Sequence, residues 1–146
     1  MLGSGLDEAT CRERDQLAVI ADQFGAPTGA ELLADITAHA MCSVRSQQEL
    51  AGLYNLAAGG ETSWHGYASH VIEYARARSK GDGQRIRVAP DGVVPIPTSG
   101  YPLPAPRPLN SRLNTARLQA AFGVVLPDWR CGVERMLDEV LEVSPI

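Results

Sequence analysis

The sequence has little of what several classes of function require. It contains a single lysine and carries a net charge of −4, so it lacks the basic excess that a groove for nucleic acid normally shows. No apolar run approaches the roughly 18 residues of a membrane span. Charged side chains crowd residues 7–15, where a secretory signal would have its apolar segment. We therefore expect a cytoplasmic protein that neither binds nucleic acid nor enters a membrane.

The patterns of metal-binding and disulfide-bonded proteins are missing as well. Cys11, Cys42 and Cys131 are far apart and match no zinc or C-x-x-C spacing, which predicts free, buried thiols. His65 and His70 would point about 140° away from each other on a helix. We predict no metal site made from histidine or cysteine.

What is present suits one small domain. The 146 residues, 45% of them hydrophobic, are enough for a buried core. Short apolar runs bounded by turn residues predict strands at 17–20, 52–57, 85–88 and 93–96. Helical periodicity predicts helices over 28–40, 62–80, 115–122 and 127–141. Trp64 and Trp129 fall on apolar helix faces, so we expect both in the core. Helices alternating with short strands predict the α/β class.

Several residues mark where these helices begin. Thr28 is the expected N-cap of the first helix, and Glu31 completes a capping box with it. Ser63 or its neighbour Thr62 is expected to cap the second helix. Pro127 is expected in the first turn of the last one. Between the second and third helices, six prolines at residues 95–108 exclude a helix and impose an extended segment.

Four blocks of the sequence follow one another in the order of a known family. They are residues 21–40, 52–64, 101–114 and 122–129, of which the third reads YPLPAPRPLNSRLN. Together they resemble the C-terminal part of the dTDP-4-dehydrorhamnose reductases, the last enzymes of dTDP-L-rhamnose synthesis. The resemblance runs over residues 12–146 and leaves residues 1–11 as a flexible start outside the family pattern. It implies the small substrate lobe of an extended short-chain reductase, which in the family packs on a Rossmann domain.

Two features of such reductases are not found in this chain. A dinucleotide site normally needs a Gly-rich turn between a strand and a helix, and the glycines at residues 3–5 follow no strand. The family also uses a Tyr-x-x-x-Lys pair, but Arg76 stands four residues before Lys80. The resemblance therefore implies a truncated substrate-side lobe, inactive alone, whose NADPH or NADH would bind the absent half. The implied partners are a dTDP-sugar and either a Rossmann half or a second copy. The alternative is a non-catalytic module that binds a sugar nucleotide or a partner.

The resemblance also implies candidate substrate-side residues. Gln23 and Thr28 lie in the loop where the family's chain passes from the Rossmann domain to the substrate lobe. Amides at the helix start can seat a diphosphate, or Thr28 can act only as a cap. Arg107 is the one charge in the proline-rich segment. It pairs either with the nucleotide diphosphate or with a nearby carboxylate.

A metal site follows from the resemblance alone. Some family members form a dimer around magnesium held by glutamates, whose positions here are Glu31 and Glu139. Magnesium prefers hard oxygen ligands and keeps several waters, so few carboxylates suffice. The alternative is that Glu31 belongs to the capping box and Glu139 to an exposed helix face.

Overall fold

The computed structural model describes residues 15–78, 86–101 and 105–142. In chain order the elements are β1 (Leu17–Ile20), β2 (Phe24–Gly25), α2 (Ala30–Ser46), β3 (Thr62–Ser63), α3 (Trp64–Arg78), β4 (Val93–Ile96), α4 (Ala116–Phe122) and α5 (Trp129–Glu142). Short 3-10 turns lie at Gln48–Leu50, Pro90–Gly92 and Thr98–Gly100. The predicted α/β class is confirmed. No helix in these ranges is both long and apolar enough to cross a bilayer.

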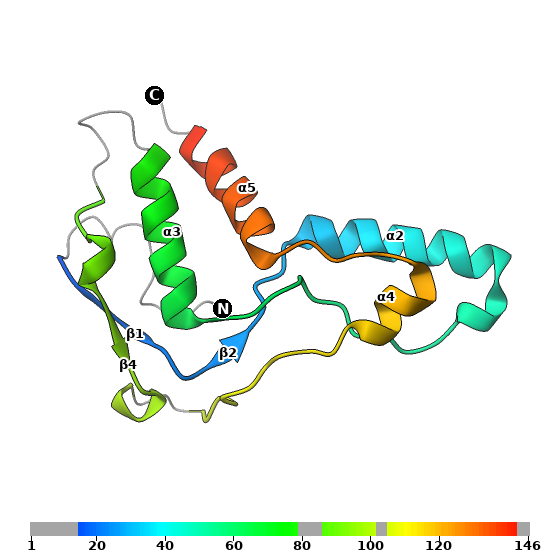
Figure 1. The fold of residues 1–146 in the computed structure, drawn as a ribbon, viewed down its shortest axis with the longest axis horizontal. Helices are drawn as coiled ribbons and strands as arrows, with labels where there is room; N and C mark the ends of the chain where they lie inside the picture. Colours follow the sequence, from blue (N-terminus) through cyan, green and yellow to red (C-terminus); the bar gives the residue numbers. More distant parts are fainter. Residues whose placement is uncertain (1–14, 79–85, 102–104, 143–146) are drawn as a thin grey trace.

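The first part of the core lies between a small parallel sheet and α3. β1 pairs with β4 in a register that places Leu17 opposite Val93. Because side chains alternate along a strand, Leu17, Val19 and Val93 share one face, and they pack with Ala68 and Ile72 of α3. Figure 1 shows α3 lying across the two strands. The apolar runs predicted at 17–20 and 93–96 are therefore both strands.

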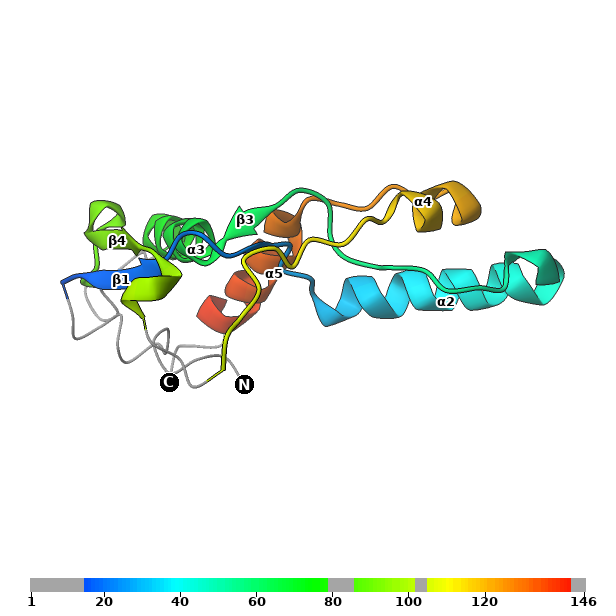
Figure 2. The same ribbon diagram turned by 90° about the horizontal axis from the view of Figure 1, so that it is seen from below.

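The second part of the core joins α3 to α5, which run side by side (Figures 1 and 2). Trp129, Val133 and Leu137 recur at helical spacing and bury one face of α5. Trp129 is 2% exposed, as expected of a core residue, whereas Trp64 is 41% exposed. The prediction of a core position is therefore wrong for Trp64, the first residue of α3.

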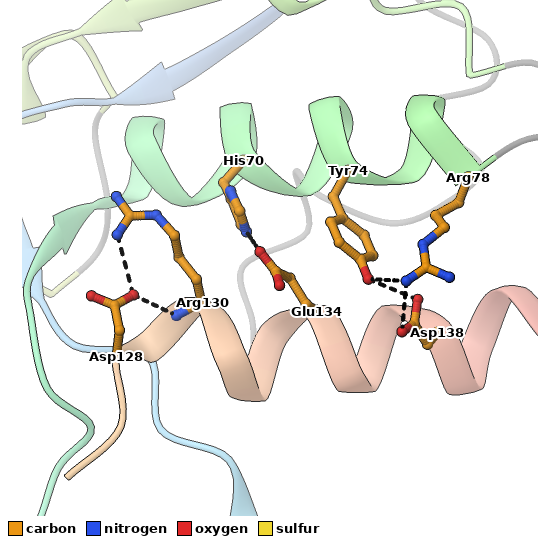
Figure 3. A network of polar contacts seen from close by, with 7 residues as sticks. All are labelled: His70, Tyr74, Arg78, Asp128, Arg130, Glu134 and Asp138. Atoms are coloured by element: carbon orange, nitrogen blue, oxygen red, sulfur yellow. Dashed lines mark hydrogen bonds and ion pairs between the residues drawn. The ribbon is translucent and has the colours of Figure 1, made fainter. Parts of the chain in front are cut away.

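Polar side chains line the same helix pair (Figure 3). His70 Nε2 lies 3.1 Å from Glu134 Oε1, although the angle is not that of a hydrogen bond. One turn further on, the Tyr74 hydroxyl donates to Asp138 Oδ1 at 2.9 Å, and Arg78 contacts Asp138 Oδ2 at 3.1 Å. Burial and the neighbouring Asp138 raise the pKa of Tyr74, so its phenol stays protonated as the donor. These contacts fix the register of α3 against α5.

The third part of the core forms an arm that extends away from the sheet (Figures 1 and 2). Leu118 and Phe122 of α4 are buried against Ile36 and Ala40 of α2. Tyr54 meets the Phe122 ring edge-on at a centroid distance of 5.0 Å. None of the α2 residues is fully buried, so one face of this long helix is open to solvent.

Two predicted strands are wrong. Residues 52–57 run as extended chain without a ladder, and the nearest strand-like contact is the single bridge between Gly59 and Asp128. Their apolar side chains Tyr54 and Leu56 pack on the arm instead of on a sheet. Residues 86–88, the described part of the strand predicted at 85–88, are irregular too, although Val88 is buried.

The helix starts differ in part from the predicted ones. Ser63 Oγ accepts the Gly66 amide at 3.1 Å and caps α3, as expected. α2 instead begins after Gly29, without a side-chain cap, because the Thr28 hydroxyl bonds elsewhere. The capping box is therefore wrong. Asp128 Oδ1 accepts the Arg130 amide at 3.0 Å, which places Pro127 before α5 instead of within it.

The thiols differ from their prediction as well. Cys42 and Cys131 are free, but both are exposed, so the prediction of buried thiols is wrong for them. Cys42 lies on α2 of the arm, and Cys131 lies in the first turn of α5. Cys11 lies outside the described residues.

Candidate functional site

A pocket of about 400 Å³ opens where the loop after β1 meets the start of α3 and the end of the proline-rich segment. It collects residues from three distant parts of the sequence. They are residues 23–27, residues 62–64 with Tyr67, and Arg107, Pro108 and Ser111. Two of the predicted substrate-side residues, Gln23 and Arg107, therefore lie in the same pocket.

Backbone pairing holds these walls together. β2 pairs antiparallel with β3, so that Phe24 lies opposite Ser63. On its other side, Phe24 donates its amide to Leu109 O and accepts the Ser111 amide, each at 2.8 Å. The short strand β2 is thus held between the start of α3 and the segment that carries Arg107. Proline limits the freedom of that segment, which keeps the pocket wall in place.

Gln23 is the most buried polar residue of the pocket, with 5% of its surface exposed. Its Nε2 donates to Thr98 Oγ1 at 3.1 Å. The Thr98 hydroxyl in turn donates to Asp22 Oδ1 at 2.6 Å, and the Thr98 amide donates to the same carboxylate. These hydrogen bonds, that of the hydroxyl first, lower the pKa of Asp22 below its ordinary value, so the carboxylate is ionised at neutral pH.

Three aromatic side chains give the pocket its apolar walls. Phe24 and Trp64 are 38% and 41% exposed and lie in the same pocket, so their rings are accessible to a ligand there. Tyr67 packs edge-on against Trp64 at a centroid distance of 6.3 Å. Burial raises the pKa of Tyr67, so it is a neutral phenol here and not a base. The helical pattern alone did not indicate this role for Trp64.

Arg107 supplies positive charge at the rim. Among the described residues it has no carboxylate partner, whereas Arg112 nearby pairs with Glu61 at 2.8 Å. The guanidinium of Arg112 also lies over the Phe24 ring, 5.8 Å from its centroid. Arg107 is thus the arginine of this pocket whose hydrogen-bond donors are available to an anion.

Thr28 does not line the pocket. Its hydroxyl donates to Ala26 O at 2.9 Å and accepts the Ala58 amide at 3.0 Å. Ala58 belongs to the segment before β3, so Thr28 ties the loop after β2 to that segment. The side chain thus holds this loop in place and is not among the residues that line the pocket.

The predicted magnesium ligands meet at an arginine. Arg135 lies 3.0 Å from Glu31 Oε1 and 3.7 Å from Glu139 Oε1. The pKa of Glu31 is lowered first by a hydrogen bond from the backbone amide of Glu31 itself, and then by the hydrogen bond and positive charge of Arg135. As they lie, the two carboxylates face a guanidinium instead of an open cation site, which does not fit a divalent ion within one copy of the chain.

Histidine forms no metal site in the part of the chain that the structure describes, where no group of three potential ligands gathers. His39 Nε2 lies 3.1 Å from Phe122 O, and His65 Nε2 lies 2.9 Å from Val93 O. Both rings thus connect a helix to a neighbouring element. His39 and His65 therefore each have a structural contact in the fold.

The described residues do not fit a dinucleotide cofactor. β1 is followed by β2 before α2 begins at Ala30, and α2 extends away from the β1–β4 sheet (Figure 1). A dinucleotide site needs a glycine-rich turn that leads directly from a strand into a helix packed on the sheet. Arg76, four residues before the single lysine of the sequence, donates to Ile86 O and Val88 O and supports the chain before β4.

Comparisons with known proteins agree with this arrangement. The family described as RmlD substrate binding domain matches residues 6–142, a range that begins within the predicted non-family start at 1–11. A dTDP-4-dehydrorhamnose reductase of Shigella flexneri is 53% identical over 135 residues, which cover 92% of this chain and 43% of that protein. A second one, from Burkholderia thailandensis, is 40% identical over 134 residues, 89% of this chain and 44% of that protein. This chain thus spans less than half the length of these relatives.

Solved structures show the same fold. The dTDP-4-dehydrorhamnose reductase of Bacillus anthracis, crystallised in complex with NADP, aligns with a TM-score of 0.68 at 27% identity. The alignment covers 90% of this chain and 41% of that one. An orthologue from Clostridium acetobutylicum aligns with a TM-score of 0.72, covering 91% of this chain and 41% of that one at 24% identity. From the match over residues 6–142, we conclude that the chain belongs to the RmlD substrate binding domain family.

Proposed function

We propose that this chain is the substrate-side lobe of a dTDP-4-dehydrorhamnose reductase and that it binds the dTDP-sugar in the pocket beside Trp64. The observation that carries the proposal is the composition of that pocket. It combines a buried amide at Gln23, exposed aromatic rings and the available guanidinium of Arg107. A sugar nucleotide offers matching groups, namely a planar base, hydroxyls and a diphosphate.

Each part of the pocket has a distinct task in this proposal. Arg107 can hold the diphosphate through two parallel hydrogen bonds. Trp64 and Phe24 can pack against the base or the sugar ring. NADPH or NADH, bound by another part of the enzyme, supplies the hydride for the keto carbon. The described residues supply binding and orientation but no acid–base pair, so we expect no turnover from the chain alone.

The sheet supports pairing with a Rossmann half. The Ala21 amide donates to Ile96 O, so the backbone N–H and C=O of Ile96 point towards β1. Successive residues of a strand direct these groups to opposite edges, so the nitrogen of Pro95 points to the outer edge of β4. Proline cannot donate there, which suits an edge strand. β1 contains no proline, and among the described residues its other edge has no partner. β1 can therefore accept a further strand.

The sheet face opposite α3 points to the same partner. Ala18 and Val94 are exposed on it, next to the half-buried Ile20 and Ile96. Parallel sheets are normally covered on both faces. An apolar face and an open edge together fit the remaining strands and helices of a Rossmann domain.

A binding measurement tests the proposed function. Titration of dTDP-glucose into the chain, followed by calorimetry, should give a dissociation constant that weakens at least about tenfold in Arg107→Gln, because a charge-assisted contact is lost. Arg45→Gln is the matched control, since Arg45 is an exposed arginine in the last turn of α2 and is not part of the pocket. Equal affinity of the two variants would place the nucleotide elsewhere.

The second candidate is a non-catalytic module that binds a sugar nucleotide or a partner. It is favoured by the pocket itself, which combines a buried amide, aromatic rings and an arginine, while the described residues offer no catalytic pair. Mixing the chain with the nucleotide-binding half of the Shigella flexneri reductase separates the two candidates. Reductase activity in the mixture supports the lobe, and binding without activity supports the module.

The magnesium-linked homodimer remains a separate proposal. Arg135 neutralises Glu31 and Glu139 in one copy, so it would have to move before a second copy could share an ion there. Sedimentation velocity with and without magnesium tests this. Association that requires magnesium and is abolished by Glu31→Gln supports the site, whereas a monomer under both conditions contradicts it.

A further inference from the structure

Hydrogen bonds hold the amide of Gln23 in one orientation. Their direction follows from which of the neighbouring groups, Asp22 and Thr98, carry a proton to donate. Gln23 is 5% exposed and lines the pocket, so its polar atoms must find partners in the protein or in a ligand. An amide has a donor end and an acceptor end of nearly equal size. Which end meets Thr98 decides which end is left for the ligand.

Asp22 fixes the direction of the first hydrogen bond. An ionised carboxylate only accepts hydrogen bonds, and Thr98 approaches it with both its amide, at 2.9 Å, and its hydroxyl, at 2.6 Å. The pKa of Asp22, lowered by these bonds, keeps it ionised at neutral pH. The single hydroxyl proton of Thr98 therefore lies towards Asp22.

Thr98 in turn fixes the orientation of the Gln23 amide. With its proton committed, Thr98 Oγ1 can only accept from the amide, which lies 3.1 Å away. Gln23 must present Nε2 to Thr98, and its carbonyl oxygen Oε1 is the group left for the pocket. The opposite orientation would place an acceptor against an acceptor in a half-buried position.

We propose that Asp22 and Thr98 are positioning residues that fix Gln23 with Oε1 towards the pocket, so that the site selects a ligand group that donates a hydrogen bond. This inference rests on the proposed function, because a dTDP-sugar has two kinds of donor, the imide N–H of the base and the hydroxyls of the sugar. Ligands that lack the donor at this position leave Oε1 unpaired and bind roughly tenfold to a hundredfold more weakly.

Asp22→Asn makes the reverse orientation of Gln23 available. A carboxylate can only accept from Thr98, whereas an Asn amide that turns its nitrogen to Thr98 Oγ1 leaves the hydroxyl proton free to point towards Gln23. Gln23 can then turn its oxygen to Thr98 and offer Nε2 to the pocket. The near-identical shape of Asn keeps the fold, which far-UV circular dichroism and thermal unfolding verify.

Calorimetry on the intact chain tests the inference with two ligand pairs. One compares dTDP with its N3-methyl derivative, which lacks the imide donor. The other compares dTDP-glucose with deoxyfluoro analogues in which fluorine replaces one hydroxyl at a time. We expect one donor-deficient ligand to bind the wild type roughly tenfold to a hundredfold more weakly. The pair that responds identifies the donor as base or sugar.

Three variants separate positioning from a structural role. The ratio of the two dissociation constants in the ligand pair that responds should fall in Asp22→Asn and in Thr98→Val, and persist in Thr98→Ser, which keeps the hydroxyl. A purely structural role would weaken all ligands alike and leave the ratio unchanged, which would overturn the inference. Equal binding of every ligand to the wild type would overturn it while leaving the proposed function intact. Failure of dTDP and dTDP-glucose to bind at all would overturn both.

Discussion

Trp64 offers a direct view of the pocket, because the chain has two tryptophans in opposite environments. Trp64 lines the pocket and is 41% exposed, whereas Trp129 is 2% exposed in the core. Contact between a base and an aromatic ring is worth about 1–3 kcal/mol by alanine substitution. Trp64→Ala should therefore raise the dissociation constant of dTDP by roughly 5- to 150-fold.

Intrinsic tryptophan fluorescence reports the same contact by a second measurement. We expect dTDP to quench the exposed Trp64, so the signal should disappear in Trp64→Phe while much of the affinity remains. Trp129→Phe should retain the quenching, since its remaining tryptophan is the one in the pocket. Quenching that survives in Trp64→Phe, or an affinity unchanged in Trp64→Ala, would refute the assignment of the ligand to this pocket.

Three further predictions concern the arm, the hydrogen bonds between Asp22 and Thr98, and the contacts of Arg135 with Glu31 and Glu139. Leu118→Ala, at 4% exposure, should lower the free energy of unfolding in urea by about 2–5 kcal/mol, whereas Leu53→Ala, at 85% exposure, should change it by less than about 0.5 kcal/mol; similar losses would contradict the assigned core. Because the pKa of Asp22 is lowered from 3.8, its stabilising contribution is present above that pH and lost as the pH falls through the folded-state value. Between about pH 2 and 5, the free energy of unfolding should thus change less with pH in Thr98→Val than in wild type. Equal pH dependence in the two proteins would argue against the hydrogen bonds between Asp22 and Thr98. Arg135→Ala should promote any magnesium-dependent association seen by sedimentation, and reduced association would contradict the competition between arginine and metal.

A sequence pattern predicts a strand correctly where the fold supplies a neighbouring strand to pair with it. The runs at 17–20 and 93–96 are strands because each finds the other as a partner. The run at 52–57 has similar composition but is no strand, because a ladder requires a neighbour that the sequence of one segment cannot reveal. In the same way, threonine is a common helix cap, but the hydroxyl oxygen of Thr28 instead accepts a hydrogen bond from the Ala58 amide, 30 positions away.

The site shows the same limit. Gln23 and Arg107 were indicated by the family blocks and lie together in the pocket. Trp64 has the periodicity of a core residue, and only the position of the first turn of α3 over the pocket exposes it. The link from Asp22 to Thr98 spans 76 positions, a distance over which a single sequence gives no signal.

The most direct test of the account is reconstitution of the reductase. The chain would be mixed with the separately produced nucleotide-binding half of the Shigella flexneri relative, and NADPH oxidation would be followed with dTDP-4-dehydrorhamnose. We predict turnover in the mixture, none from either part alone, and a strongly reduced rate with Arg107→Gln. Turnover by the chain alone, or a stable complex of the two parts without activity, would contradict the claim that this chain is the substrate-side lobe.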